Sequence, residues 1–222
     1  MADAPILILP GLDGSDLMLG QFRQLCANDG NATVETLPDD DTMGYPELAV
    51  HFSPVIRDLS KCHIIAESFS GPIGILLAAR YPEIVNRLTL VASFATSPVP
   101  RIASILPWSM IFQLPMPSSV AKHFFVGRCK SLIPVLRSAV RQSAPATLRH
   151  RLRLVQNVDV TEELSGLNCH LSYIRPTSDR LIPQRCLDQI LDVYPATIVH
   201  EIDGPHLILE TQPENSWRQI AE

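Results

Sequence analysis

The sequence predicts an α/β fold, in which a mostly parallel sheet of about six strands is covered by helices and interrupted by a helical insertion. Short apolar runs alternate with segments of helical pattern over most of the 222 residues. Residues 95–160 differ, because prolines are frequent there and helical patterns occur without any strand pattern. We therefore expect a core built from residues 1–94 and 161–222, with residues 95–160 inserted as a helical cap.

Six runs have the character of buried strands. Residues 5–9 (PILIL) are continuously apolar, which is typical of a strand covered on both faces of a parallel sheet. The expected strands are residues 5–9, 33–37, 63–66, 87–94, 169–174 and 196–202. Helices are expected at residues 16–28, 45–59, 73–80 and 185–194 and from residue 213, and in the cap at residues 118–125, 130–141 and 146–156.

Residues 62–80 (CHIIAESFSGPIGILLAAR) have the layout of a nucleophile elbow, in which a serine stands on a tight turn between strand and helix. Ser68 is at the corner, small Ala66 and Ser70 flank it at a distance of two, and Pro72 suits the first turn of a helix. Such a turn exposes the serine Oγ and directs the following N–H groups toward an oxyanion. Its pattern departs from the usual G-x-S-x-G, and a serine-rich turn that only caps the helix is the alternative.

A nucleophilic serine needs a base, and the base needs an orienting acid. His206 lies in the loop after the last expected strand, and Asp179 lies in the loop after the strand before it. Because the carboxyl ends of parallel strands meet at one edge of a sheet, these loops should converge on Ser68. The alternative for His206 is a loop histidine without a role.

Several other roles remain open for the acidic residues. Asp179 could instead pair with Arg180 or Arg185, and Asp159 or Asp203 could then orient the base. Next to the first strand, Asp13 is expected to cap the following helix, and Glu67 is expected to form a buried structural hydrogen bond.

Four motifs together resemble the α/β-hydrolase superfamily, in its small serine esterase and lipase type. They are LPGLDGS after the first strand, AESFSG at the elbow, SDRLIP around the acid and GPHLILETQPE around the histidine. The resemblance implies an α/β-hydrolase fold with Ser68 as nucleophile, Asp179 as acid and His206 as base. It also implies an oxyanion hole formed by the backbone N–H groups of Leu12 and Phe69.

The sequence departs from this family in two places. Pro10-Gly11 stands where the family has His-Gly, and the two antiparallel strands that open the family's sheet have no counterpart here. The expected activity is hydrolysis of a small carboxylic ester by a serine hydrolase that needs no cofactor and no metal. Acyl thioesters of CoA or a carrier protein are the alternative substrates, and a non-catalytic ligand-binding protein is the alternative from another class.

The expected cap has the chemistry of a surface for apolar and anionic groups. Residues 95–158 contain nine Lys and Arg and no Asp or Glu, although the chain has a net charge of −5. This asymmetry favours an anionic ligand or partner, such as a thioester or a membrane surface, unless the cap only docks on an acidic body. An apolar substrate group is favoured by Trp108, Met110, Ile111, Phe112, Phe124 and Phe125.

Composition excludes several classes of partner and indicates a compartment. The acidic balance does not favour nucleic acid, and no apolar stretch is long enough for a transmembrane segment. The five cysteines are scattered without a CxxC pair, and the N-terminal residues lack the pattern of a signal peptide. We therefore expect a cytoplasmic protein without disulfides.

Overall fold

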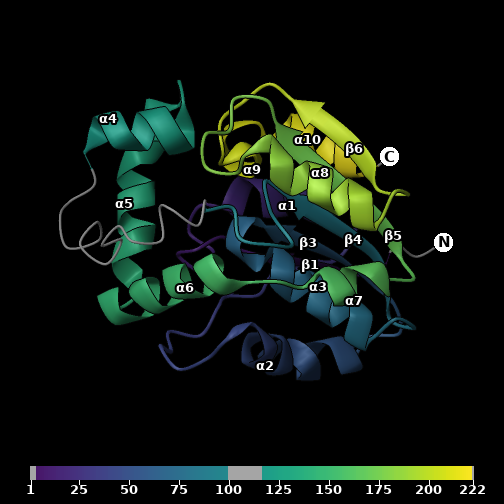
Figure 1. Cartoon of the computed structure of the whole chain (residues 1–222). Helices are drawn as coiled ribbons and strands as arrows, with labels where there is room; N and C mark the ends of the chain where they lie inside the picture. The colour runs from purple at the N-terminus through teal and green to yellow at the C-terminus, as the bar shows by residue number, and fades with distance from the viewer. Residues whose placement is uncertain (1–3, 100–116, 222) are drawn as a thin grey trace.

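The computed structural model describes residues 4–99 and 117–221, which form a three-layer α/β structure (Figure 1). Its sheet has six strands in the order β2-β1-β3-β4-β5-β6, and every neighbouring pair is parallel. The strands are β1 (Ile6–Leu9), β2 (Ala32–Val34), β3 (Cys62–Glu67), β4 (Val85–Val91), β5 (His170–Pro176) and β6 (Ile198–Ile202). The predicted fold class is confirmed.

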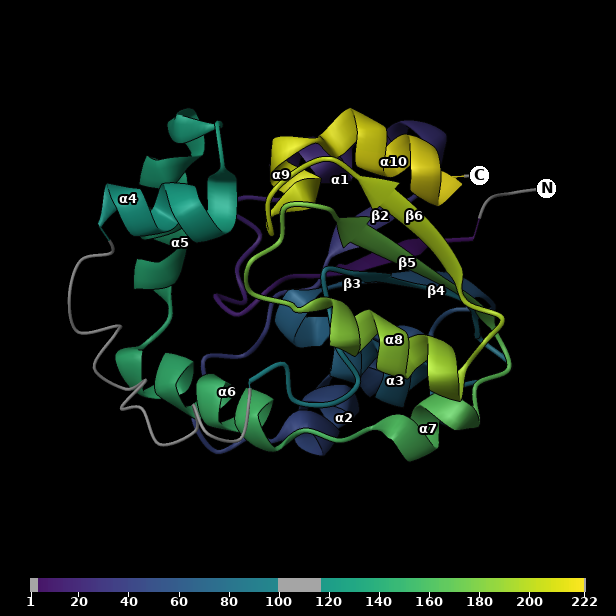
Figure 2. The ribbon, with the colours of Figure 1, turned by 45° about the horizontal axis from the view of Figure 1, so that its top comes forward.

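Helices cover both faces of the sheet (Figure 2). One face is covered by α2 (Tyr45–Arg57), α3 (Gly71–Arg80), α7 (Thr161–Ser165) and α8 (Gln184–Val193), and the other by α1 (Gly20–Asp29), α9 (Ile208–Thr211) and α10 (Pro213–Ala221). None of the helices in the described part of the chain has the length and apolarity needed to cross a membrane.

Burial on both faces explains why the strands are continuously apolar. Leu7 and Leu9 of β1 pack on the side of α2 and α3, whereas Ile6 and Ile8 pack on the side of α1 and α10. All four side chains are buried. An alternating polar face would leave one helical layer without an apolar surface to pack on.

The described part of residues 95–160, in the connection between β4 and β5, lies beyond the carboxyl edge of the sheet. Its described helices are α4 (Ser118–Val120), a π-helix (Ala121–Val126), a 3-10 turn (Lys130–Leu132), α5 (Ile133–Gln142) and α6 (Pro145–Asn157), and they stand beside the core (Figure 2). The two ends of the segment meet, because the Val160 N–H donates to the Ala95 carbonyl and Thr96 bridges to Asp159. This pairing favours the predicted boundaries, which stay a prediction. Arg101, Trp108, Met110, Ile111 and Phe112 lie outside the described residues.

Several predicted elements have different bounds in the structure, among them the first helix and the second strand. The first helix was expected from residue 16 but begins at Gly20. The second strand was expected over residues 33–37, but β2 ends at Val34. The Glu35 N–H still donates to the Ile8 carbonyl of β1, and the Leu37 N–H then donates to the Gly14 carbonyl in the loop after that strand. The short helices α7 and α9 were not predicted.

Close packing of α3 on the sheet makes a prediction about Gly74. A Cβ at this position would lie 2.9 Å from Ala66 Cβ and 2.9 Å from Leu88 Cδ1. We expect Gly74→Ala to lower the free energy of unfolding by about 1–3 kcal/mol, as overpacked cores do. Gly20 at the start of α1 is the matched control, because a Cβ there meets nothing within 4 Å. Urea unfolding that gave Gly74→Ala the stability of Gly20→Ala would contradict the packing argument.

Candidate active site

Ser68 lies where β3 ends and α3 begins, at the carboxyl edge of the sheet. Its backbone has φ +48°, the left-handed region that residues with a side chain adopt at a cost in energy. Ser68 opens a 3-10 turn (Ser68–Ser70), and Pro72 lies in the first turn of α3. The strand, the strained turn and the proline-started helix are those expected for a nucleophile elbow.

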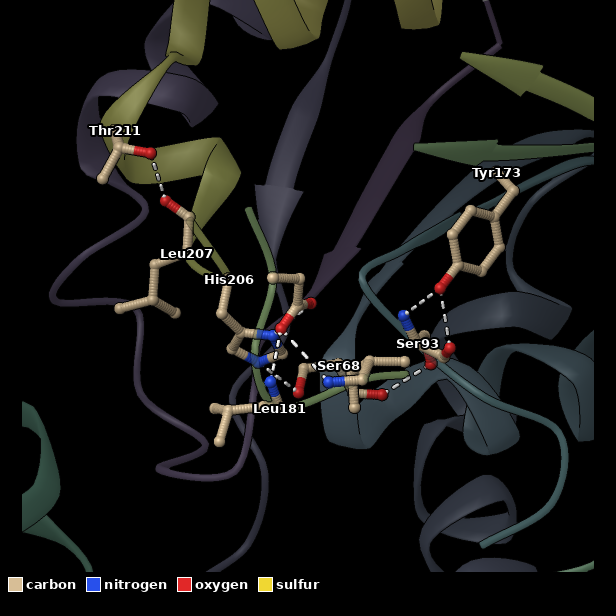
Figure 3. A network of polar contacts seen from close by, with 9 residues as sticks. Ser68, Ser93, Tyr173, Leu181, His206, Leu207 and Thr211 are labelled. Carbon is tan, nitrogen blue, oxygen red and sulfur yellow. Dashed lines mark hydrogen bonds and ion pairs between the residues drawn. The ribbon is translucent and has the colours of Figure 1, made fainter. Parts of the chain in front are cut away.

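Ser93 and Tyr173 hold the strained turn from the side of β4 and β5 (Figure 3). Ser93 Oγ donates to the Ser68 carbonyl at 2.6 Å. Tyr173 donates its hydroxyl hydrogen to the Ser93 carbonyl at 2.8 Å and accepts the Ser93 N–H at 3.0 Å. A Cβ at Gly71 would lie 1.8 Å from Ser93 Oγ, so only glycine leaves room for this network.

The structure brings together Ser68, His206 and Asp179 from three loops, and Figure 3 shows the Ser68 and His206 side chains next to one another. Ser68 Oγ lies 2.9 Å from His206 Nε2, and His206 Nδ1 lies 2.8 Å from Asp179 Oδ2. Because the carboxylate can only accept, Nδ1 carries the proton and Nε2 is left to accept the serine hydroxyl hydrogen. His206 is 4% exposed, so this chain of hydrogen bonds is largely shielded from water.

Asp179 is held by its own loop as well as by the histidine. Its Oδ1 accepts the N–H groups of Leu181 at 2.7 Å and Ile182 at 3.1 Å. Burial raises the pKa of Asp179, but the charge and hydrogen bond of His206, with these two N–H groups, outweigh burial and leave the pKa below its usual value. The carboxylate is therefore ionised and fixed in direction.

The other acids considered from the sequence lie elsewhere. Asp159 Oδ1 accepts the N–H and hydroxyl hydrogen of Thr161 at the end of the cap segment. Asp203 Oδ1 accepts the hydroxyl hydrogen of Thr177 at 3.2 Å. Among the described residues, neither forms a hydrogen bond or an ion pair with His206, whereas Asp179 does.

The arginines beside Asp179 also bond to other groups. Arg180 contacts His123 of the π-helix. Arg185 donates to the carbonyls of Ser97 and Pro98 after β4. The expectation that Asp179 might pair with either arginine is therefore not met in the structure.

The turn after β1 lies beside Ser68, and every carbonyl from Pro10 to Gly14 accepts a hydrogen bond. A Cβ at Gly11 would lie 3.9 Å from Ser68 Cβ. Among the described residues, the N–H groups of Leu12 and Phe69 have no acceptor. The donors to the five carbonyls, in chain order, are Ser70 Oγ, Gly14 N–H, the Arg151 guanidinium, Ser143 Oγ and Leu37 N–H.

The expectation that Asp13 caps the following helix is wrong. Asp13 Oδ2 accepts the N–H and hydroxyl hydrogen of Ser15 within the turn. The first helix starts only at Gly20, after Leu19, and has no side-chain cap. The carboxylate therefore stabilises the turn itself, which lies between β1 and α1.

A pair of buried carboxyl groups, Glu67 and Glu210, was missed by the sequence analysis. Glu67 is 2% exposed, and the two carboxyls interact, although Glu67 Oε1 and Glu210 Oε2 are buried without a hydrogen-bond partner. Burial, followed by the charges of Glu210 and Asp13, raises the pKa of Glu67 well above its usual value. Burial chiefly raises the pKa of Glu210 to about 7. Such a pair is most stable when it holds a proton.

The only sequence signal for this pair was the position of Glu210 four residues after His206, in the GPHLILETQPE motif. Glu67 was expected to form a structural hydrogen bond, but a second acid as its partner could not be read from the spacing. Residues 4–99 and 117–221 contain no group of three or more His, Cys, Asp or Glu side chains suited to hold a metal ion.

Solved structures of hydrolytic enzymes are similar to the whole chain. A thermophilic esterase from Thermogutta terrifontis aligns with a TM-score of 0.84 and 16% identity, over 99% of this chain and 89% of that one. A carboxylesterase from the thaumarchaeon Nitrososphaera gargenis aligns with a TM-score of 0.83 and 15% identity, over 100% of this chain and 90% of that one. The chain has the α/β-hydrolase fold.

An enol-lactonase from Burkholderia xenovorans has a similar structure, with a TM-score of 0.83 and 14% identity over 99% of this chain and 90% of that one. At the level of sequence, no family model and no curated protein matches the chain. The fold expected from the four motifs is thus confirmed by structure, at identities too low to transfer a substrate.

The carboxyl pair makes a prediction about stability and pH. Because the pKa of Glu210 is raised, the folded protein keeps a proton that the unfolded chain releases above about pH 4.5. The free energy of unfolding that Glu210 contributes therefore falls as the pH rises from about 4.5 to about 7. Glu210→Gln removes the titration and mimics the protonated acid. We expect its free energy of unfolding to rise relative to wild type between pH 5 and pH 8.

Urea unfolding at four pH values over that range is the measurement. Glu83→Gln, the same change at an exposed position, is the control. A difference between Glu210→Gln and wild type that stayed constant from pH 5 to pH 8 would contradict a buried protonated pair.

Proposed function

We propose that the protein is a serine hydrolase that cleaves carboxylic esters through an acyl-enzyme on Ser68. The observation that supports this most strongly is the unbroken line of hydrogen bonds from Ser68 Oγ through His206 to Asp179, on a left-handed elbow. A buried histidine that only stabilised the fold would not need a strained serine as its partner. The esterases of the same fold support hydrolysis as the reaction class.

Acylation begins when His206 Nε2 takes the Ser68 hydroxyl proton and Oγ forms a bond to the ester carbonyl carbon. The carbonyl electrons move onto its oxygen, which becomes an oxyanion. When the carbonyl re-forms, the ester C–O bond breaks, and the leaving alcohol takes the proton from Nε2. Asp179 stays ionised and holds the imidazolium in place, as its lowered pKa favours.

Deacylation repeats these steps with water in place of Ser68. The water gives a proton to Nε2, its oxygen bonds to the acyl carbon, and the second oxyanion collapses with cleavage of the Ser68 ester bond. Ser68 recovers its proton and the carboxylic acid is released. In both halves, the oxyanion would accept the N–H groups of Leu12 and Phe69, which have no acceptor among the described residues. The reaction uses no cofactor.

The substrate we propose is a small ester with an apolar group, enclosed by the cap of residues 95–160. The cap reaches the site at His206: the Phe125 ring lies edge-on to the histidine at 6.3 Å, and the Leu207 N–H donates to the Phe125 carbonyl at 3.1 Å. Leu207 packs with Met18 and Val126 in an apolar cluster next to this contact. Apolar walls around a few polar groups are typical of small-molecule sites.

Thioesters of CoA or a carrier protein are a second candidate substrate class, favoured by the charge of the cap. Lys122, Arg128, Lys130 and Arg141 are exposed there, and the described part of the cap up to residue 158 contains no acidic residue. A positive surface beside the site would attract an anionic acyl donor or partner. None of the five cysteines, all of which lie among the described residues, forms a disulfide, which fits the proposed cytoplasmic location.

The nucleophile makes the first functional prediction. Ser68→Ala should lower kcat/KM for p-nitrophenyl esters by at least about 1,000-fold and abolish labelling by a fluorophosphonate, because both require the Oγ atom. Asp179→Asn should lower kcat with Ser68 still present, since the histidine then loses its fixed tautomer. A folded wild type that neither turned over esters nor reacted with the probe would overturn the proposal and favour a ligand-binding protein.

The basic cap makes a separate prediction about salt. If it attracts anionic thioesters, KM for an acyl-CoA should rise about 5- to 10-fold between 0.02 and 0.5 M NaCl, while KM for a neutral p-nitrophenyl ester changes little. Lys122→Gln combined with Arg128→Gln should reduce this salt dependence. Equal salt dependence for the two substrates would contradict the thioester alternative.

A further inference from the structure

Arg151 extends from α6 of the cap into the core and is the one cation of the described cap that is buried, with 2% exposed. Burial lowers the pKa of Arg151, and the charges of Asp13 and Asp39 act in the opposite direction. Within the described residues, no carboxylate oxygen lies within 4.0 Å of it. Because burying an unpaired cation is costly, the groups that Arg151 does contact determine its role.

The guanidinium contacts both segments that hold the proposed oxyanion donors. Its Nη1 donates to the Leu12 carbonyl at 2.8 Å, and its Nη2 donates to the Pro38 carbonyl at 2.9 Å. Its Cζ lies 5.9 Å from the centre of the Phe69 ring, in a cation–π contact. The Phe69 ring also stacks on Tyr45 at 5.0 Å. One side chain thus contacts Leu12 through its backbone and Phe69 through its ring.

These contacts restrict how the turn after β1 can rotate. The bond to the Leu12 carbonyl fixes the plane of the Leu12–Asp13 peptide, and Ser143 Oγ fixes the next carbonyl at 2.5 Å. Ser143 directly follows α5, and Arg151 lies in α6. A Cβ at Gly14 would lie 2.6 Å from Arg151 Nη1, so the backbone of the turn packs directly against the guanidinium.

We propose that Arg151 is a positioning residue for the oxyanion hole, which it assembles by holding Leu12 and Phe69 in one arrangement around Ser68. This inference rests on the proposed function and deepens it. The planar fork suits the task, because it donates to two carbonyls at once while its charge lies over the Phe69 ring. A lysine ammonium is a single point charge and cannot make these contacts together.

A role in the oxyanion hole differs measurably from a role that only joins the cap to the core. Donors to an oxyanion act in the transition state, so misplacing them lowers kcat and leaves KM nearly unchanged. A purely structural arginine would instead lower stability, or change both constants through loss of the cap. Arg23, exposed on α1, offers the same substitution away from the site.

The test compares wild type, Arg151→Lys, Arg151→Ala and Arg23→Lys with a p-nitrophenyl ester. We expect Arg151→Lys to lower kcat about 10- to 100-fold with KM changed less than about threefold, and to slow fluorophosphonate labelling of Ser68 in parallel. Arg23→Lys should match wild type. Guanidinium chloride at low millimolar concentration should restore part of the kcat of Arg151→Ala, whereas NaCl at the same concentration should not.

Three results would overturn the inference. An active wild type with equal kcat for Arg151→Lys would remove the positioning role and leave the hydrolase proposal standing. If Arg151→Lys lowered kcat/KM chiefly by raising KM, or only in proportion to the fraction of protein that is unfolded, Arg151 would have a structural role alone. A folded wild type without turnover or labelling would overturn the hydrolase proposal, and this inference with it.

Discussion

Ser68 keeps a left-handed backbone, φ +48°, that costs about 1–3 kcal/mol for a residue with a side chain. The surrounding structure has to offset this cost, and the packing around the elbow is arranged accordingly. Ser93 fixes the Ser68 carbonyl, Tyr173 fixes Ser93, and Gly71 leaves the space that Ser93 Oγ needs. Since Tyr173 comes from β5, the elbow depends on a strand that follows it by about a hundred residues in the chain.

The order of strands in the sheet explains how three distant loops reach this elbow. β1 and β4 flank β3, so the turn after β1 and Ser93 after β4 contact Ser68 from opposite sides. β5 and β6 follow, and their loops supply Asp179 and His206. The parallel arrangement places all these carboxyl ends at one edge, and the described helices α4, α5 and α6 lie beside that same edge.

Much of this arrangement could be predicted from the sequence, because it depends on local patterns. Continuous apolar runs revealed the strands, and the positions of Asp179 and His206 after the last two strands were enough to expect them beside Ser68. Glu210, Ser93 and Arg151 were not assigned to the site, since their roles arise from contacts across the fold. Arg151 and Leu12 are 139 residues apart, and nothing in the spacing pairs them. Arg149 and Arg153 of the same helix have the same sequence pattern, although neither is buried.

Electrostatics around the turn after β1 links these unpredicted residues to the proposed chemistry. Three carboxyl groups, those of Asp13, Glu67 and Glu210, lie close enough to influence one another. Ionised together, they would oppose a negative charge forming on a substrate oxygen beside Ser68. A proton held by the glutamate pair removes part of that opposition, and the Arg151 guanidinium, held near Asp13, offsets more of it.

The arginine that we propose to position the backbone donors would therefore also balance the charge behind them. Arg149 and Arg153 on the same helix are half-buried and exposed, whereas the buried Arg151 acts in a medium where a charge is weakly screened. In this view the cap contributes more than apolar walls for a substrate. The end of α5 and α6 supply Ser143 and the guanidinium to the turn after β1, so without these two helices the turn would lose two of the donors to its carbonyls.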